Sequence, residues 1–477
     1  MIDFLIIISY FIVTILIGLY FGRNVRSIRD FAIADRRYSI PILVATITAT
    51  MLDSGSTIGL TEKVFSVGIV FILIFLGEPI TKLLMAQYIA PRMVKFADMI
   101  SVGDMMDSFY GKPGRIVTGV AGTLLCIGYV GAQISAMGYF CQYFLEISYF
   151  WGVVLGAAVA IFYSAYGGIR AVTATDVLQF AAIIIAIPMI CNIGLNIVGG
   201  YESLLTMIPD DSLNFFPQDE NPFKYIFLFL IFCIPFLNPA VIQRLLMAKD
   251  TKQIVQSLRI AALIDIPFYL TIGSLGLIVL ALQPGQEANL SLPYLIHAFL
   301  PVGIKGLAIV GIISIMMSTA DSYLNAASIA VVHDIISPLN QKSLPDKTEL
   351  LMARTTTVAI GVASILTAFS FTSVVELVLV FLNCWAPVVV VPLLAGIFDF
   401  KANARSFLCS VAAGLGMYCL WLTFSLEEVL GFGSLVPAML ANAFVFFVVH
   451  YSQQGSAIKM LTTKTESSNE KKAKTAA

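Results

Sequence analysis

Thirteen apolar segments, each close to the length of a transmembrane helix, follow one another along the chain with few residues between them. A bilayer core needs about 20 apolar residues per helical crossing, and helices satisfy all their backbone hydrogen bonds within one segment. The segments are residues 3–22, 40–60, 64–90, 116–144, 148–166, 173–198, 223–246, 257–283, 303–334, 352–370, 374–398, 404–424 and 433–452. The sequence therefore predicts an all-α integral membrane protein with about 13 transmembrane helices.

Composition agrees with this class and excludes several others. Of the 477 residues, 58% are hydrophobic and only 12% are charged, whereas a soluble protein carries about 25% charged residues. The net charge of −1 argues against a nucleic-acid partner. We expect no enzymatic activity, because the sequence has no HExxH, phosphate-binding loop or GxSxG motif with triad partners.

Lysine and arginine indicate the orientation. With the N-terminus outside, 24 of the 28 basic residues fall in inner loops or in the C-terminal tail, as the positive-inside rule requires. We expect a multi-pass protein of the plasma membrane (the inner membrane in a bacterium), with its C-terminus in the cytoplasm. Residues 1–452 would form the transmembrane domain, and the polar residues 453–477 a disordered cytoplasmic tail.

Two segments are interrupted. The run MLDSGSTIG at residues 51–59 breaks the second segment, and the run IPFLNP at residues 234–239 breaks the seventh. Interrupted helices at matching positions of two halves point to a transporter binding site, because unwound backbone exposes carbonyls and amides to ions and solutes.

The ninth segment carries a polar cluster. Ser318, Thr319, Asp321 and Ser322 fall within five residues at bilayer depth. Polar groups there are costly unless they face a cavity, a partner or an ion, and oxygen ligands suit a hard cation. The cluster predicts a cation site, with hydroxyls bonded to carbonyls one turn earlier as the structural alternative.

Four motifs occur in a characteristic order between about residues 5 and 450. They are GL at 59–60 with Gly68, AYGGIRA at 165–171 with TDVLQ at 175–179, QR at 243–244 with AKD at 248–250, and STADSYLN at 318–325 with DI at 334–335. Together they resemble the sodium:solute symporter family, which includes bacterial sodium-coupled proline, galactose and sialic acid carriers. The resemblance implies a LeuT-type core of two inverted five-helix repeats, residues 40–198 and 223–398, with peripheral helices at 3–22 and 404–452.

The resemblance also implies a sodium site. It maps Ser318 and Thr319 onto the hydroxyl ligands of the family's main sodium site, and it adds the backbone carbonyls of Ala49, Leu52 and Ile315. Five neutral oxygens favour a weakly held monovalent cation over Ca²⁺, which prefers carboxylates.

A second cation site would involve Asp176. In family members that bind a second sodium, the matching aspartate and nearby hydroxyls hold it. Here Ser318, Asp321 and Ser322 fall at those positions, and Asp321 stands where those carriers have a hydroxyl. The extra carboxylate would strengthen a second site or hold a proton. The alternatives are that Asp176 caps a helix starting near residue 177 or makes a structural hydrogen bond between helices.

Nine residues at the breaks and on facing segments are candidates for the solute pocket. They are Asp53, Ser54, Ser56, Phe75, Glu78, Tyr129, Asn238, Asp265 and Trp385. The carboxylates favour an amine-bearing or zwitterionic solute over a dianion.

Each candidate has a structural alternative. Asp53 and the neighbouring serines would bond to the local backbone at the break, and Glu78 would form an i,i+4 ion pair with Lys82. Asp265 would meet a solute amine, a proton or a buried Lys or Arg, and the aromatic residues would pack. Arg244 would anchor its helix against lipid headgroups or acidic partners.

These features predict a symporter that couples inward sodium flow to uptake of a small polar organic solute by alternating access. It would use one or two sodium ions and no organic cofactor, contact membrane lipid, and be a monomer or weak oligomer. Proton coupling through Asp265, Asp321 or Glu78 is the alternative, which the hydroxyl pair at 318–319 argues against. A transporter-like membrane sensor is disfavoured because only about 25 polar residues follow the last helix.

Overall fold

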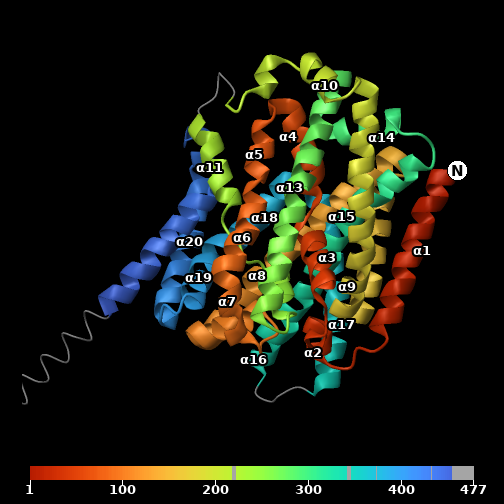
Figure 1. Cartoon of the computed structure of the whole chain (residues 1–477). Coiled ribbons are helices and arrows are strands. Elements are labelled where there is room, and N and C mark those ends of the chain that lie inside the picture. The colour runs from red at the N-terminus through yellow and green to blue at the C-terminus, as the bar shows by residue number, and fades with distance from the viewer. Residues whose placement is uncertain (217–221, 341–344, 372, 431, 454–477) are drawn as a thin grey trace, which may run out of the picture.

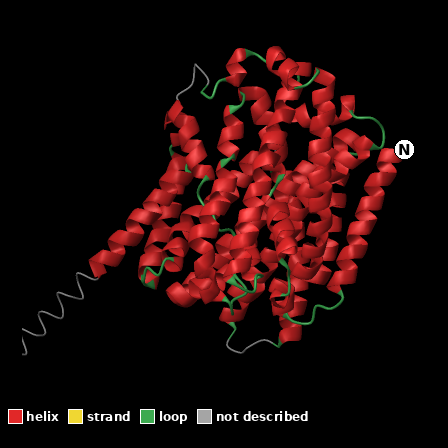
Figure 2. Cartoon of the chain, in the orientation of Figure 1, coloured by secondary structure: helices red, strands yellow, loops and turns green. Residues whose placement is uncertain are grey.

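The computed structural model describes residues 1–216, 222–340, 345–371, 373–430 and 432–453. Over these residues the chain is a bundle of helices without a strand (Figure 2). Figure 1 shows α1 at one edge of the bundle and α20 at the other, with α15 and α9 between them.

Several crossings are built from more than one helical piece, where η marks a short 3₁₀ or π turn. In chain order the elements are α1 (Ile2–Gly22), α2 (Ile28–Ile33), η1 (Ala34–Arg36), α3 (Ile40–Met51), η2 (Gly55–Gly59), α4 (Leu60–Val67), α5 (Val70–Phe75), α6 (Gly77–Leu84), η3 (Met85–Ile89), α7 (Ala90–Met93), η4 (Val94–Phe96), α8 (Val102–Leu145), α9 (Tyr149–Val198), α10 (Tyr201–Met207), η5 (Asp210–Leu213), α11 (Pro222–Phe232), α12 (Pro239–Leu246), α13 (Thr251–Leu282), η6 (Ala288–Leu290), α14 (Ser291–Phe299), α15 (Ile304–Ile329), η7 (Ala330–Ile336), α16 (Ser337–Leu339), α17 (Asp346–Ser370), α18 (Val374–Trp385), η8 (Ala386–Val390), α19 (Val391–Ile397), α20 (Ala404–Thr423), α21 (Leu426–Leu430) and a last helix, Leu435–Gln453.

Among the described residues, ten helices are long and apolar enough to cross a membrane. The pair Ile40–Met51 and Gly55–Val67, bent by 67°, adds an eleventh if it is one span. The 50 residues of α9 would extend about 75 Å, more than twice the thickness of a bilayer core of about 30 Å. Non-helical dihedral angles at Gly168 divide α9, so a kink stands where a loop was expected between residues 166 and 173. The number of thirteen crossings stays a prediction.

The expected edges of the second and third segments were wrong. The break after Met51 bends the crossing without ending it, because the helix resumes through η2 and α4 to Val67. The turn comes at Gly68, whose φ of +110° suits glycine and whose Cβ would lie 2.3 Å from the Ser212 carbonyl oxygen. The third crossing therefore begins near Val70 rather than at residue 64.

The centre of the bundle is α15. In an apolar 18-residue stretch of the span Ile304–Leu339, 94% is buried inside the protein. The matching share in α1 is 22%. A helix that is almost fully enclosed has no face left for lipid. Its polar residues must therefore face other helices. The polar cluster predicted from residues 318–322 thus lies inside protein.

A buried ion pair joins α6 to α13. The Lys82 ammonium donates to Asp265 Oδ2, and both side chains are 0% exposed. The expected pair between Lys82 and Glu78 is not formed; the cation instead neutralises a carboxylate that the bundle encloses completely. Taking one partner away would leave the other charge buried and unpaired, which is costly.

The kink at Gly168 generates the first prediction. This residue has φ +52°, and a Cβ there would lie 2.4 Å from the Phe31 ring and 2.7 Å from the Phe31 carbonyl oxygen. Gly168→Ala should lower the free energy of unfolding by about 1–3 kcal/mol. Gly416→Ala is the control, because it lies in α20 with no heavy atom within 4 Å of its Cβ position. Thermal melting of the detergent-purified protein measures both. Equal melting temperatures for the two variants would contradict the strain at Gly168.

The buried pair generates the second prediction. Lys82→Met leaves Asp265 charged and enclosed, so we expect it to cost about 3–5 kcal/mol of stability. Lys82→Met combined with Asp265→Asn removes both charges and should recover most of that loss. The comparison uses melting temperatures of the purified variants. A double variant that melts as low as the single variant would show that the pair does not carry the effect.

Candidate functional site

The break that follows α3 is held by its own side chains. The Ser56 N–H donates to Asp53 Oδ1 at 2.8 Å, and the Asp53 N–H donates to Ser56 Oγ at 2.8 Å. This reciprocal pairing is a capping box for the half-helix that starts at η2. The Ser54 N–H donates to Gln133 Oε1 on α8 at 3.0 Å. Asp53 and Ser56 therefore make the local backbone bonds considered as their structural alternative.

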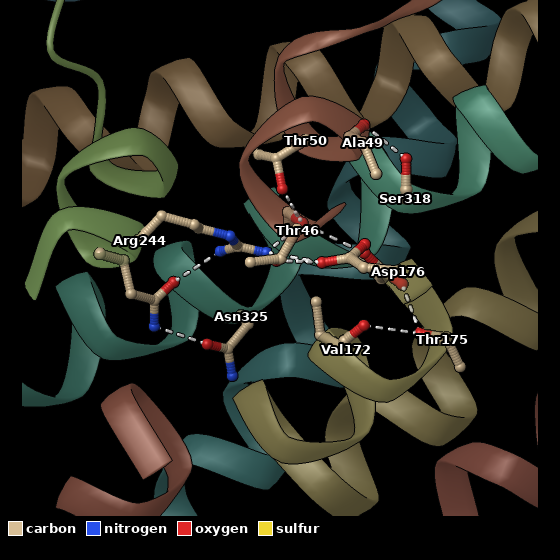
Figure 3. Close-up of polar contacts among 12 residues, drawn as sticks. Thr46, Ala49, Thr50, Val172, Thr175, Asp176, Arg244, Ser318 and Asn325 are labelled. Atoms are coloured by element: carbon tan, nitrogen blue, oxygen red, sulfur yellow. Dashed lines mark hydrogen bonds and ion pairs between the residues drawn. The ribbon is translucent and has the colours of Figure 1, made fainter. Parts of the chain in front are cut away.

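Two hydroxyls of α15 meet the end of α3. Ser318 Oγ donates to the Ala49 carbonyl at 2.6 Å and lies 3.2 Å from the Ile315 carbonyl. Thr319 Oγ1 donates to the Leu52 carbonyl at 2.9 Å and also lies 3.2 Å from that of Ile315. Figure 3 shows the contact between Ser318 and Ala49. All five residues are at most 1% exposed, so the five oxygens expected for the sodium site form one cluster.

The Ala49 and Leu52 carbonyls in this cluster are open to a cation because α3 ends there. The last four carbonyls of a helix have no partner within it, and the Leu52 N–H closes the last turn on Thr48. The C-terminal end of a helix also carries about half a negative charge, which attracts cations. The same oxygens would coordinate a small cation once the two hydroxyl hydrogens turn outward.

A charged cluster lies beside these five oxygens (Figure 3). Asp176 Oδ2 accepts from Thr46 Oγ1 at 2.5 Å and lies 3.5 Å from Arg244 Nη2. The Arg244 guanidinium also donates to Ser322 Oγ, which lies 3.0 Å from Thr50 Oγ1. Arg244 is 1% exposed, so it meets an acidic partner inside the bundle rather than lipid headgroups. Asp176 does not cap a helix, because α9 continues through it to Val198.

Asp321 belongs to the same cluster. Its Oδ2 accepts from the Tyr163 hydroxyl at 2.5 Å and from Thr175 Oγ1 at 3.3 Å, and its Oδ1 accepts from Ser322 Oγ at 3.3 Å. The structure thus joins Asp321 and Ser322 to Asp176 through Arg244. Ser318 does not contact them by hydrogen bond in the described residues; it bonds to Ala49 and Ile315 instead.

The charges of this cluster limit what it can bind. Asp176, Asp321 and Arg244 are all at most 1% exposed. If both carboxylates are ionised, one guanidinium leaves a net charge of −1. An uncompensated buried charge is costly enough that proteins neutralise it by a partner or a proton. The arrangement is therefore suited to one further monovalent cation or one proton.

Four hydroxyls of this cluster were not among the site residues predicted from the sequence. They belong to Thr46, Thr50, Tyr163 and Thr175. Thr46 and Thr50 are four residues apart and so share one face of α3, a pattern that was visible in the sequence. The role of Tyr163 had no sequence signal, because only the fold brings it to Asp321.

The second break is also held by local bonds. Asn238 Oδ1 accepts from the Val241 N–H at 2.9 Å and caps α12. The fully buried Trp385 donates from Nε1 to the Phe236 carbonyl at 2.9 Å. These two pocket candidates therefore have structural partners at the break itself.

The remaining pocket candidates divide into packing and unpaired groups. Phe75 packs against Phe232, with ring centroids 4.6 Å apart, and Tyr129 stacks on Tyr323 at 4.7 Å with ring planes 3° apart. Glu78 is half-buried at the start of α6. No hydrogen bond or ion pair involves its carboxylate within the described parts of the chain.

One further group has metal-ligand chemistry. Asp104, His333 and Asp334 offer ligand atoms within 4.8 Å of one another. Arg115 already supplies a positive charge there, with Nη2 3.0 Å from Asp104 Oδ1 and Nε 3.7 Å from Asp334 Oδ1. This cluster joins the start of α8 to η7 as an ionic contact.

Comparison with known proteins places the chain in a family. The sequence model of the sodium:solute symporter family matches residues 31–414. The sodium/proline symporter 2 of Staphylococcus saprophyticus is 22% identical, over 94% of this chain and 93% of its own length. The osmoregulated proline transporter OpuE of Bacillus subtilis is 23% identical, over 92% of each.

Solved structures show the fold. A Na⁺-coupled sialic acid symporter, in a substrate-bound outward-open state, superposes with a TM-score of 0.80 at 20% identity, covering 94% of this chain and 96% of that one. Mhp1, a nucleobase-cation-symport-1 family transporter, gives a TM-score of 0.61 at 11% identity, covering 90% and 95%. The fold is that of the LeuT-type transporters, as the resemblance implied. This multi-pass membrane protein, with sodium as its coupling ion and a small molecule as its solute, therefore belongs to the sodium:solute symporter family.

Proposed function

We propose that this chain imports a small polar organic solute with sodium by alternating access, and that the oxygens of Ser318, Thr319, Ala49, Leu52 and Ile315 hold the sodium. The observation that carries the proposal is the meeting of two α15 hydroxyls with the free carbonyls at the end of α3. The relatives named as sodium/proline symporters support the same class of transport.

The chemistry of the cluster favours sodium. Its five oxygens are neutral, so a monovalent cation is bound without the carboxylates that Ca²⁺ prefers. The negative end of the α3 dipole adds attraction without adding a fixed charge. Such a site holds its ion loosely enough for release on the other side of the membrane.

The site links binding to conformation. A cation between α3 and α15 stabilises the arrangement in which these helices touch, and its loss lets them separate. The proposed orientation places the N-terminus outside and the C-terminus in the cytoplasm, with repeats over residues 40–198 and 223–398. Inward movement of one sodium ion across 100 mV then supplies about 2.3 kcal/mol.

A second cation is proposed at Asp176, Asp321 and Ser322. The specific observation in its favour is charge: two buried carboxylates face one buried guanidinium. A second sodium would bring this cluster to neutrality. The number of ions per cycle follows from whether sodium or a proton fills that role.

The sodium site generates the third prediction. A ligand that binds only the folded state stabilises it by RT ln(1 + [L]/Kd). The purified protein should therefore melt higher in sodium than in potassium at equal ionic strength. Ser318→Ala combined with Thr319→Ala should reduce the difference, because both hydroxyl ligands are lost, and any remainder would come from the second cation proposed at Asp176 and Asp321.

A matched control is available for this double variant. Ser328 and Thr357 are also fully buried hydroxyls that donate to carbonyls of their own helices, at 2.8 and 2.9 Å. Ser328→Ala combined with Thr357→Ala should retain the sodium effect. A sodium effect that is undiminished in the Ser318/Thr319 variant, or no effect in the wild type, would contradict the proposed site.

A further inference from the structure

The amide groups at the first break are already occupied. In transporters built on broken helices, the N-terminus of a half-helix points at an anionic group of the solute. Here the N–H groups of Asp53 and Ser56 bond within the capping box, and that of Ser54 bonds to Gln133. The chain's own Asp53 carboxylate stands at this helix end, so a solute carboxylate would meet a like charge there.

The charges around the break are mostly negative. Glu78 has Asp53, Asp265 and Lys82 as its electrostatic neighbours, which makes three carboxylates and one ammonium. Lys82 is committed to Asp265 by the buried ion pair between α6 and α13. Because that cation is already used, the Glu78 carboxylate is left without a partner in the described residues.

Two fully buried atoms, one in the buried ion pair and one at the first break, also lack partners. Asp265 Oδ1 and Gln133 Nε2 have no hydrogen bond in the described structure, although both side chains are 0% exposed. Buried polar groups are nearly always hydrogen-bonded. Glu78 and Asp265 are thus available to accept hydrogen bonds from a bound solute, and Gln133 is available to donate one.

An aromatic wall completes the surroundings. Tyr129, stacked on Tyr323, has Asp53 and Glu78 as electrostatic neighbours. The face of an aromatic ring attracts an organic cation when it lies within about 6 Å. Carboxylates next to aromatic rings are therefore suited to a positively charged nitrogen more than to a sugar or an anion.

We infer that the solute carries a protonated amine, that Glu78 binds this amine, and that no carboxylate on the solute is needed for binding. The inference rests on the proposed sodium-coupled uptake and names the class of its solute. The Lys82–Asp265 pair keeps a second carboxylate in place without cancelling the charge of Glu78. Gln133 Nε2 is left to donate to a carbonyl or hydroxyl of the solute.

Matched probes separate the two ends of a solute. We would use proline, valine and glutamine, each as the free L-amino acid, as its amide and as its N-acetyl derivative. The amide keeps the amine and removes the carboxylate; the N-acetyl form does the reverse. Melting temperatures of the purified full-length protein are measured in sodium over a range of probe concentrations, with wild type, Glu78→Gln and Glu62→Gln. Glu62 is the control, because it is also half-buried and lies in the neighbouring α4.

The expected result is stabilisation by an amide as strong as that by the free amino acid on at least one skeleton, and none by any N-acetyl form. Glu78→Gln should weaken that binding about tenfold or more, since it removes a charge-assisted hydrogen bond, and Glu62→Gln should leave it unchanged. Stabilisation by an N-acetyl form, a free amino acid that binds while its amide does not, an unchanged Glu78→Gln variant, or no response to any amine would each overturn the inference.

The same samples keep this test separate from that of the sodium site. The sodium effect measured without any probe reports on the proposed cation sites and does not depend on the solute. If Glu78→Gln keeps that effect, the variant is folded and binds sodium, and its response to the probes reports only on the solute. A wild type with no sodium effect would instead remove the proposed function on which the inference rests.

Discussion

The contact between the end of α3 and the middle of α15 is the interaction on which the rest depends. Helix α3 stops at Met51 with its last carbonyls unpaired, and α15 supplies Ser318 and Thr319 at the same depth. Without these hydroxyls, the carbonyls of a broken helix would face the interior of the bundle unsatisfied. An ion can replace the hydroxyl hydrogens there, so the contact that closes the break is also the proposed point of coupling.

Charge pairing explains several of the other buried ionisable groups. Lys82 neutralises Asp265, Arg244 lies against Asp176, and Arg115 holds the acids at the start of α8. The pairs of Lys82 with Asp265 and of Arg244 with Asp176 join elements distant in sequence, so they fix how the helices pack. Three of the carboxylates described above have no cation among these pairs: Asp321 within the charged cluster, and Asp53 and Glu78 near the first break. These unpaired carboxylates agree with the proposed binding of a cation beside Asp321 and of a solute amine at Glu78.

The sequence was sufficient for the fold class and the two breaks, because long apolar runs and their interruptions have few structural solutions in a bilayer. The five oxygens that meet at the α3–α15 contact were named through the family resemblance, and their binding of sodium stays a prediction. It failed where the outcome depends on a distant partner. Lys82 has an acid four residues away and pairs instead with Asp265, on another crossing. For Arg244 the sequence left lipid headgroups and acidic partners open, and the structure shows the acidic partner, Asp176. The loop expected near Gly168 is a kink, since one positive φ angle can redirect a helix without ending it.

Equilibrium binding of radioactive sodium to the purified protein is the most direct test of the central claim. We expect saturable binding that unlabelled sodium displaces and potassium does not. Removing both hydroxyls, on Ser318 and Thr319, should abolish binding at the α3–α15 contact while the protein stays folded by its melting curve. Saturable binding of unchanged affinity and amount in that variant would contradict the account, because it would place the ion somewhere other than the break in α3.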